Sequence, residues 1–376
     1  MNQRRRFLIS GALIMLGLYM TGSCNLRKKM IINGKNKTAD LSNSTWLPNW
    51  RMLKSLDSVR KALQLQCIKT VSPFWYEVND AGILRVKLGS DNMTIPDMAT
   101  VDLLKHNGAL VVPTITTTLT PDDFIRLYSD RSEQQKLAVA VTQEVIFNKY
   151  DGIDLNLENI ALTTDVPTAK IVRGVYTALC QCISSELSRA NKLLSITVMA
   201  RWSDDFEIWR DKLIPAVYDY KSLSRVASVF RVMAYDQHAP NTSPGPIAGF
   251  QWVKNICDWT SRNVYAANRV EIGIPLYGRD WGGGKVKSVL YDNVVQLRNK
   301  YPHSEVIYSD TEKEETFTYV SAEGDKHTVW YSNNQSVTDR LALIRIYGFR
   351  GGTFWATSYE SPSLWDVIHA TSSANV

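Results

Sequence analysis

The sequence predicts an α/β fold, namely a (β/α)8 TIM barrel with a small α+β insertion between its seventh and eighth strands. Short apolar segments alternate with helical patterns about eight times, which is the order of a parallel sheet with helical crossovers. Eight such units over roughly 330 residues fit a barrel with insertions. A doubly wound open sheet is the alternative, but no Gly-x-Gly-x-x-Gly motif follows the first strand to support it.

The predicted elements follow one another in a regular order from residue 45 onward. Candidate strands cover residues 45–50, 67–74, 109–115, 152–157, 194–199, 228–235, 270–276 and 352–356. Candidate helices lie between them and include residues 131–148, 168–190, 250–263 and 336–346. Each strand candidate is a short apolar run, whereas each helix candidate shows a helical pattern. This order predicts one barrel over residues 45–376.

The regular order breaks between Arg279 and Ser332. Short β-like segments occur there at residues 306–308, 316–320 and 327–331. Three short strands in one interval do not fit a single strand and helix of a barrel. We therefore expect the α+β insertion to cover residues 279–332.

The first 24 residues resemble an export signal and not a part of the fold. Three arginines at positions 4–6 precede the apolar run 7–20, which is too short to span a bilayer comfortably. The following Thr21-Gly22-Ser23-Cys24 resembles a bacterial lipobox, in which Cys24 is lipidated. The arginines also resemble a twin-arginine signal. We expect a lipoprotein, with ordinary cleaved secretion and an uncleaved anchor as the alternatives.

Residues 25–44 are polar and weakly periodic, which predicts a tether between the membrane and the folded domain. The basic cluster at 27–29 favours an anionic membrane surface. The sequence therefore predicts an extracytoplasmic protein held at a bacterial membrane by its N-terminal lipid, or one that is secreted or associated with the cell wall.

The charge and the cysteines exclude several functions. The formal net charge is +6, from 43 Lys and Arg against 37 Asp and Glu, and without the three signal arginines it is +3. That is too small to argue for nucleic acid, and the sequence shows no basic stripe with interleaved aromatic residues. The five cysteines show no Cys/His spacing typical of a metal site. We expect no nucleic-acid partner, no metal and no cofactor.

The segment 152–158 alternates between apolar and polar residues. Three apolar side chains occupy one face, and Asp154, Asn156 and Glu158 occupy the other. In a barrel, one face of each strand points into the interior. Burying carboxylates costs several kcal/mol unless they are paired, so the polar file is understandable if Glu158, at the C-terminal end, faces a substrate. Acidic neighbours also raise the pKa of one carboxyl group, which keeps an acid protonated near neutral pH.

Several motifs together resemble glycoside hydrolase family 18, the chitinase-like hydrolases. The stretch D-G-I-D-L-N-L-E at 151–158 resembles the family signature D-G-x-D-x-D-x-E. Three further stretches resemble the family's later strands, namely M-A-Y-D at 233–236, G-I-P-L-Y-G at 273–278 and G-G-T-F-W at 351–355. The stretch S-P-F-W-Y at 72–76 is similar to the second strand in the branch with spore-germination and cortex-lytic enzymes. Four motifs in the right order at barrel spacing make the resemblance specific.

The resemblance covers about residues 45–366 and implies a retaining, substrate-assisted hydrolase, which departs from the usual two-carboxylate scheme. Its substrates would be the β-1,4 linkages of N-acetylglucosamine-containing glycans, either peptidoglycan or chitin. Glu158 would act as the acid and then as the base. Tyr235 would donate a hydrogen bond to the substrate acetamide, and Asp154 would support Asn156 through a hydrogen bond.

The resemblance also implies a set of substrate contacts. Trp355 would form an apolar floor beneath the reacting sugar, and Asp236 would contact sugar hydroxyls. Met233, Phe74 and Trp75 are further candidates for the binding site, with core packing as the alternative for Trp75. A polysaccharide that contains N-acetylglucosamine is therefore the expected partner.

Asn156 is a departure from the family pattern, which has Asp at this position. An Asn carbonyl can accept the acetamide N–H, but it brings no negative charge to stabilise the positive charge of the intermediate. We therefore expect an active but slow enzyme. A catalytically weak or inactive glycan-binding protein is the alternative, and a transglycosylating enzyme is a third reading. The retention of Glu158 favours the enzyme, because proton transfer needs a glutamate and simple sugar binding does not.

Overall fold

The computed structural model describes residues 41–373 with gaps at 90–93, 164 and 205–213. The chain divides into two units, 1–39 and 40–376, and the first lies wholly outside the described residues. The predicted export signal, Cys24 and residues 25–40 of the predicted tether therefore lie outside them as well. None of the helices in the described ranges combines the length and the hydropathy that crossing a bilayer requires.

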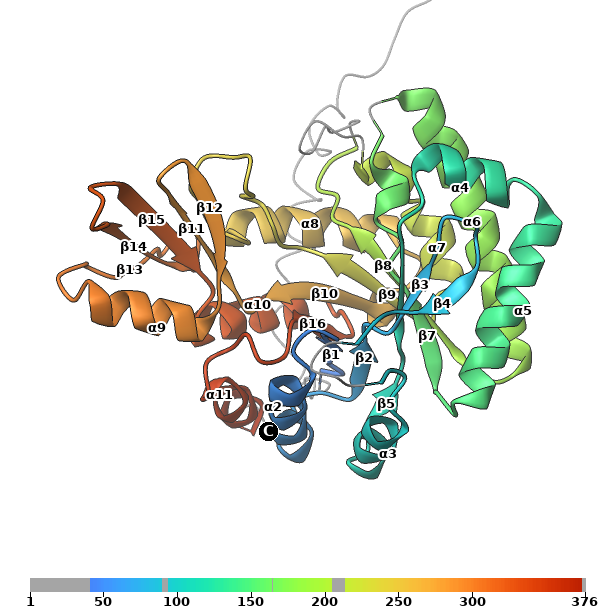
Figure 1. The fold of residues 1–376 in the computed structure, drawn as a ribbon, viewed down its shortest axis with the longest axis horizontal. Helices are drawn as coiled ribbons and strands as arrows, with labels where there is room; N and C mark the ends of the chain where they lie inside the picture. Colours follow the sequence, from blue (N-terminus) through green and yellow to red (C-terminus); the bar gives the residue numbers. More distant parts are fainter. Residues whose placement is uncertain (1–40, 90–93, 164, 205–213, 374–376) are drawn as a thin grey trace, which may run out of the picture. The chain divides into compact units, whose positions relative to one another are not determined.

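The second unit is built around one sheet of eleven strands (Figure 1). The strands are β1 (Ser44–Leu47), β2 (Thr70–Pro73), β3 (Tyr76–Val78), β4 (Leu84–Val86), β5 (Leu110–Val111), β6 (Thr114–Thr117), β7 (Gly152–Leu155), β8 (Leu193–Met199), β9 (Val229–Met233), β10 (Val270–Pro275) and β16 (Gly351–Trp355). Their order in the sheet is β4-β3-β6-β7-β8-β9-β10-β16-β1-β2-β5. All neighbours are parallel except β3 and β4.

Two continuous stretches of chain each supply one strand near one end of the sheet and one strand near the other end. The first stretch contains β2 and β3, and the second contains β5 and β6, so the sheet curls round on itself. The pair Phe74–Trp75 separates β2 from β3, and Val112–Pro113 separates β5 from β6. Strand β2 pairs with β5, and β3 pairs with β6. Pro113 has no N–H to give to a ladder, which fits the break at that point. The predicted α/β fold with a barrel-like parallel sheet is confirmed.

Helices follow most of these strands along the chain and pack outside the sheet (Figure 1). They are α2 (Met52–Gln64), α3 (Met98–His106), α4 (Pro121–Tyr128), α5 (Arg131–Phe147), α6 (Val166–Arg189), α7 (Tyr220–Val226), α8 (Phe250–Asn263), α10 (Asn334–Ile346) and α11 (Leu364–Ser373). Local signals start several of them. Thr120 caps α4 with Pro121 in its first turn, and Asp165 caps α6 by accepting from the N–H of Thr168.

A second, antiparallel sheet lies between β10 and β16 along the chain and forms the lobe with α9 in Figure 1. It consists of β11 (Gly278–Gly282), β12 (Lys285–Val289), β13 (Ile307–Tyr308), β14 (Glu315–Val320) and β15 (Lys326–Tyr331), with α9 (Tyr291–Lys300) after β12. It has a small core of its own, made of Val289, Val294, Phe317, Tyr319, Val329 and Tyr331. Strands β13 to β15 overlap the three short segments expected from sequence, whereas β11 and β12 were not expected.

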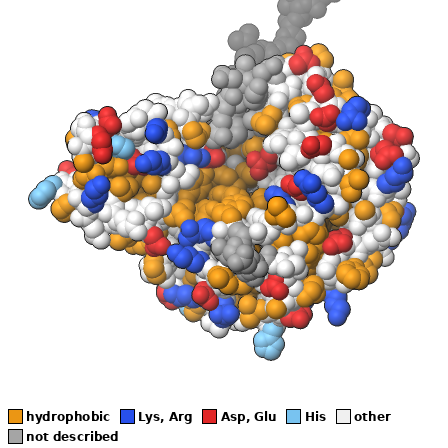
Figure 2. Space-filling model, in the orientation of Figure 1, with side chains coloured by type: hydrophobic (Ala, Val, Ile, Leu, Met, Phe, Trp, Pro, Cys, Tyr) orange, Lys and Arg blue, Asp and Glu red, His pale blue; other side chains and the backbone are white. Residues whose placement is uncertain are grey.

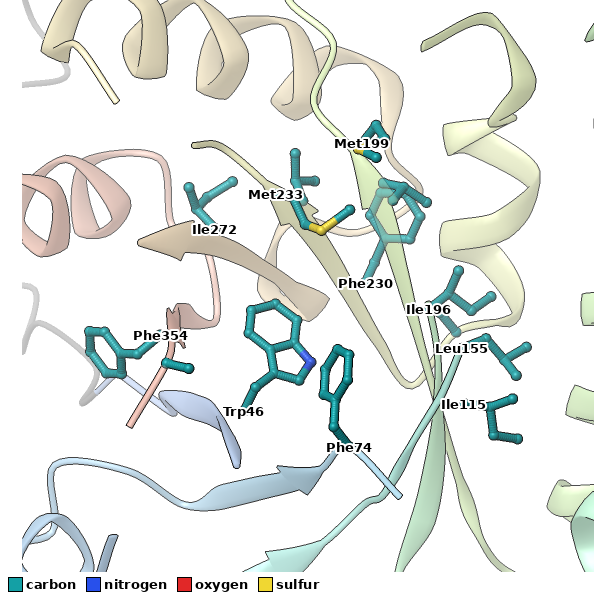
Figure 3. Packing of buried hydrophobic residues seen from close by; sticks show 14 of the residues in the cluster. Trp46, Phe74, Ile115, Leu155, Ile196, Met199, Phe230, Met233, Ile272 and Phe354 are labelled. Carbon is teal, nitrogen blue, oxygen red and sulfur yellow. The ribbon is translucent and has the colours of Figure 1, made fainter. Parts of the chain in front are cut away.

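Side chains alternate across the barrel strands as the sequence pattern predicts. Ile115, Leu155 and Ile196 point away from the interior, whereas Trp46 and Phe74 point into it (Figure 3). The interior face of β7 carries Asp154. Strand β7 ends at Leu155, two residues earlier than predicted, because the chain turns toward a short 3-10 helix at Asn159–Ala161. Asn156 and Glu158, the last two polar residues of this segment, therefore lie beyond β7 at the edge of the barrel.

Candidate active site

A cavity of about 150 Å³ opens at the C-terminal edge of the barrel sheet. Its lining residues are Glu158, Met199, Met233, Tyr235, Asp236, Tyr277 and Trp355. Met199, Met233 and Trp355 are the last residues of β8, β9 and β16. In parallel barrels the C-terminal strand ends and the loops after them form the binding face, which is where this cavity lies. Figure 2 shows the molecular surface hollowed here, with hydrophobic side chains in the hollow and acidic ones beside it.

Glu158 and Asn156 form a hydrogen-bonded pair at the inner side of the cavity. The amide nitrogen Nδ2 of Asn156 donates to Oε1 of Glu158 at 2.8 Å. Asn156 is buried, and its carbonyl Oδ1 has no hydrogen-bond partner among the described residues. A buried acceptor without a partner is costly, so this oxygen is ready to accept an N–H group from a ligand.

Asp154 is fully buried deeper in the barrel than Asn156, and side chains of neighbouring strands donate hydrogen bonds to its carboxylate. Its Oδ1 accepts from the hydroxyls of Ser195 at 2.6 Å and Thr197 at 2.9 Å. Its Oδ2 accepts from the hydroxyl of Thr114 at 2.9 Å and from the indole N–H of Trp46 at 3.2 Å. An ionised carboxylate has about four acceptor sites, so these four donors fill it.

The predicted hydrogen bond between Asp154 and Asn156 is therefore wrong. None of the hydrogen bonds described for Asp154 goes to Asn156, whose amide N–H donates to Glu158. Asp154 instead lies 3.4 Å from Nη1 of Arg231, which is also fully buried. Asp154 thus belongs to a charged cluster below the cavity, whereas Asn156, just beyond the end of β7, is paired with Glu158.

Sequence reasoning missed the cationic part of this cluster. Arg231 on β9 donates from Nε to Glu271 on β10 at 3.0 Å and from Nη1 to Ser72 at 2.8 Å. Glu271 also accepts from the hydroxyl of Ser44 at 2.5 Å and from Arg350 at 3.2 Å. Arg231 and Glu271 interrupt otherwise apolar strands, and that interruption was the available signal. Buried ion pairs persist only with good geometry and extra hydrogen bonds, which Glu271 receives in full, whereas Nη2 of Arg231 has no partner among the described residues.

Tyr235 reaches the cavity from the loop after β9. Burial raises the pKa of Tyr235 well above its ordinary value of 10.0, and the charges of Glu158 and Asp236 add to this. The phenol therefore stays protonated and can donate a hydrogen bond. Gly273 on β10 gives the ring room, because a Cβ there would come within 2.7 Å of Cε1 of Tyr235.

Asp236, the next residue, is held in an uncommon backbone conformation with a φ of 63°. Its Oδ1 accepts hydrogen bonds from the hydroxyl of Tyr277 and from Nη2 of Arg279. Tyr277 lines the cavity, although sequence reasoning assigned it no role. Its place in the motif G-I-P-L-Y-G, at the end of a barrel strand, was the signal for it.

Aromatic side chains form one wall beside Trp355. The ring centroid of Trp355 lies 5.1 Å from that of Phe74 and 5.6 Å from that of Trp46. Trp50 lies 6.1 Å from both Phe74 and Trp355, and 44% of its surface is exposed. Flat aromatic faces of this kind suit the apolar face of a sugar ring. Trp50 was not predicted for the site, although it is the last residue of the first predicted strand and lies three residues after β1.

The predicted site residues separate into three groups. Five of them line the cavity, namely Glu158, Met233, Tyr235, Asp236 and Trp355. Asn156, Asp154 and Phe74 lie directly behind the lining through the contacts described above. Trp75 does not belong to the site: it is fully buried and its ring packs 6.3 Å from that of Tyr150, so its prediction as a substrate contact is wrong. Adjacent residues in an extended chain point to opposite sides, and Phe74 takes the inward one.

The ligand types of a metal site do not gather in the part of the chain that the structure describes. No group of three His, Cys, Asp or Glu side chains there is placed to hold a metal ion. Cys67, Cys180, Cys182 and Cys257 are all free thiols.

Comparison with known sequences gives one family and distant relatives. Residues 86–360 match the profile described as "Glycosyl hydrolases family 18". An "Uncharacterized glycosylase YvbX" of Bacillus subtilis (strain 168) is 26% identical over 245 residues, which cover 65% of this chain and 67% of that protein. A "Putative sporulation-specific glycosylase YdhD" of the same organism is 24% identical over 222 residues, covering 57% of this chain and 49% of that protein. The chain thus spans about half the length of the second relative.

Solved structures share the fold at low sequence identity. A chitinase from Chromobacterium violaceum aligns with a TM-score of 0.76 at 20% identity, covering 88% of this chain and 98% of that one. The spore cortex-lytic enzyme SleL of Bacillus cereus aligns with a TM-score of 0.74 at 18% identity, covering 87% and 73%. At these identities the likeness supports the TIM-barrel-like fold alone.

Proposed function

The chain belongs to glycosyl hydrolase family 18, and we propose that it is a retaining, substrate-assisted glycosidase of the spore-cortex branch. Its substrates would be N-acetylglucosamine-containing glycans, peptidoglycan or chitin, cut at β-1,4 linkages. The observation that carries this proposal is the meeting of Glu158, Tyr235 and Trp355 in one cavity at the C-terminal edge of the barrel. These side chains supply a proton, a hydrogen-bond donor and an apolar surface.

In the first proposed step, Glu158 gives its proton to the leaving glycosidic oxygen. The carbonyl oxygen of the substrate's own N-acetyl group attacks the anomeric carbon from the opposite face, and the bond to the leaving group breaks. In the second step, water attacks the same carbon and passes a proton to Glu158, and the acetamide is restored. A positioned acid and base of this kind contributes about 10²- to 10⁴-fold to the rate.

The proposed acetamide contacts use groups that are already oriented. Tyr235 would donate its O–H to the acetamide, because burial keeps the phenol protonated. The unpartnered Oδ1 of Asn156 would accept the acetamide N–H. Asn156 supplies no negative charge for the positively charged intermediate, so we expect a slow chemical step.

The apolar wall would hold the sugar rings. Trp355 would lie under the reacting sugar, and Phe74 and Trp50, which pack against it, would enlarge the aromatic surface. The carboxylate of Asp236 would contact sugar hydroxyls while Tyr277 and Arg279 fix its orientation. Substrate binding thus would need no cofactor.

The second candidate function is a glycan-binding protein with little or no catalysis. Asn156 is the observation that favours it, because the residue leaves the intermediate without electrostatic support. Both candidates use the same aromatic wall, so binding alone cannot separate them.

The experiment that separates them compares the purified protein with Glu158→Gln on peptidoglycan and on chitin oligosaccharides, with products identified by mass. Gln keeps the size of the side chain and its acceptor for Asn156 but carries no acidic proton. We expect cleavage that falls by about 10²- to 10⁴-fold in the variant while its thermal stability is unchanged. Binding of the glycans by both proteins with no cleavage by either would establish the second candidate.

We also propose that the protein is exported and anchored to the outer side of a bacterial membrane through a lipid on Cys24. The sequence of residues 1–24 supports this proposal. We expect Cys24→Ala to move the protein from the membrane fraction to the soluble fraction and to abolish incorporation of radiolabelled palmitate. Retention at the membrane without label would instead favour an uncleaved anchor.

A further inference from the structure

Lys87 holds its ammonium group close to the aromatic wall of the cavity. It follows β4, and its backbone N–H donates to the carbonyl of Trp75 at 2.7 Å. Its Nζ lies 5.3 Å from the centroid of the Phe74 ring. Phe74 in turn packs against Trp355, which lines the cavity. The cation is therefore one aromatic ring away from Trp355, on which we expect the reacting sugar to lie.

This ammonium group is partly buried and has no direct carboxylate partner among the described residues. Burial lowers the pKa of Lys87, and the nearby carboxylates of Glu77 and Glu158 oppose that change. Glu77 already forms a salt bridge with Arg85, with 2.6 Å between Oε1 of Glu77 and Nη2 of Arg85. Within the described ranges, Lys87 has no ion pair or side-chain hydrogen bond and has only the face of Phe74. A partly buried cation in this condition gains by pairing with an anion, and a ring face alone replaces little of its lost hydration.

We propose that Lys87 is a specificity-determining residue that receives a carboxylate of the bound glycan. The site would then prefer an acidic N-acetylglucosamine glycan, of the peptidoglycan type, over neutral chitin. This inference rests on the proposed function, because it assumes that the cavity binds such glycans at Glu158.

Peptidoglycan and chitin differ in the chemical group that Lys87 would bind. Muramic acid carries a lactyl ether that ends in a carboxyl group, whereas the sugars of chitin carry none. In peptide-free glycan strands this carboxyl group is ionised and can accept from an ammonium group. Where a peptide is attached, the lactyl carboxyl is an amide, and the peptide carries the carboxylates. The shared chemistry is a carboxylate beside the sugar ring, and the two sources can be compared directly.

The test measures kcat/KM for wild type and for the variants Lys87→Met and Lys87→Arg on four ligands. These are a chito-oligosaccharide, a peptide-free oligosaccharide of alternating N-acetylglucosamine and N-acetylmuramic acid, the same oligosaccharide with its lactyl carboxyls converted to methylamides, and a peptide-bearing muropeptide. Lys54→Met is the matched control, because it removes one exposed positive charge from helix α2. It separates a contact at Lys87 from a general effect of net charge.

We expect Lys87→Met to lower kcat/KM roughly ten-fold more on the peptide-free acidic oligosaccharide than on the chito-oligosaccharide, the minimum for a hydrogen bond to a charged group. Lys87→Arg should restore most of this difference, and Lys54→Met should not produce it. Converting the lactyl carboxyls to amides should remove the difference as well. A difference seen only with the muropeptide would assign the carboxylate to the peptide.

Equal losses on acidic and neutral ligands would overturn the inference and leave the proposed function intact. Failure of the wild type to cleave any of the four ligands would instead defeat the proposed function. In that case, dissociation constants of the same ligands, measured by calorimetry with wild type and Lys87→Met, still test the contact. An unchanged ratio of acidic to neutral affinity would overturn it there too.

Discussion

The interior of the barrel and the cavity above it use the same kinds of side chain in opposite ways. Asp154 is filled by four hydrogen-bond donors and faces Arg231. Asn156, two residues later on the same side of the chain, has a buried carbonyl without a partner in the part of the chain that the structure describes. The interior carboxylates of Asp154 and Glu271 are therefore satisfied by the protein itself, whereas the amide at the cavity leaves a bond for a ligand to complete. Stability should depend on the first region and catalysis on the second.

The largest expected effect that separates the two regions is on stability. Arg231→Met would leave Asp154 and Glu271 buried without their shared cation. We expect the free energy of unfolding, measured by urea denaturation, to fall by about 3–5 kcal/mol. The control is Arg85→Met, which breaks the exposed pair with Glu77 and should cost about 1 kcal/mol or less. Similar losses in the two variants would mean that the interior charges contribute little.

An intermediate effect is expected at the boundary of the two regions. Asn156→Asp restores a negative charge beside the reacting acetamide, so we expect kcat to rise about ten-fold or more with an unchanged product pattern. Steady-state kinetics on the preferred oligosaccharide measures this. Asn159→Asp, a matched charge change on the adjacent 3-10 helix, should leave kcat within about two-fold. A loss of activity in Asn156→Asp would show that the amide is an adaptation of this chain.

The smallest expected effect concerns the hydroxyl of Tyr235, which we expect to donate a hydrogen bond to the ligand. Tyr235→Phe removes one hydrogen bond to the acetamide, so kcat/KM should fall about ten-fold. The pKa of Tyr235 is raised above its ordinary value of 10.0, so the O–H is present at every pH below that value. The ratio of wild type to Tyr235→Phe should therefore stay constant from about pH 5 to pH 9. A ratio that falls at alkaline pH would mean that the phenol ionises there.

The sequence predicted the alternation of strands and helices because each barrel strand carries its own apolar signal. Five cavity residues were also predicted: Glu158 from its place at the C-terminal end of a strand, and Met233, Tyr235, Asp236 and Trp355 from the family resemblance. The break between β2 and β3 was not predictable, since it depends on pairing between strands, whereas Pro113 was an available signal for the break between β5 and β6. Trp75 was assigned wrongly because a motif shows that two aromatic residues are adjacent but does not show which one faces inward.

The partners of Asp154 illustrate a second limit of sequence reasoning. Residues two apart on one strand have Cα atoms roughly 6.6 Å apart, whereas neighbouring strands lie about 4.8 Å apart. Donors across the strands, such as Thr114 and Ser195, are therefore closer to Asp154 than Asn156 is. Arg231 was missed for the same reason, since its role depends on carboxylates from two other strands. Charged residues inside apolar strands deserve more weight in such predictions.

The polar interior also sets the order in which this chain can be completed during synthesis. Ser44 on the first strand bonds to Glu271 and Thr353, which follow it by 227 and 309 residues. The carboxylate of Asp154 likewise gains its cationic partner only after Arg231 on β9 has been synthesised. A growing chain therefore holds unpaired charges until its last strands arrive, and contacts this distant in sequence form slowly. Ring closure and charge neutralisation then occur as one cooperative event, so we expect chains that stop before β16 to be substrates for chaperones and proteases and not partly active enzymes.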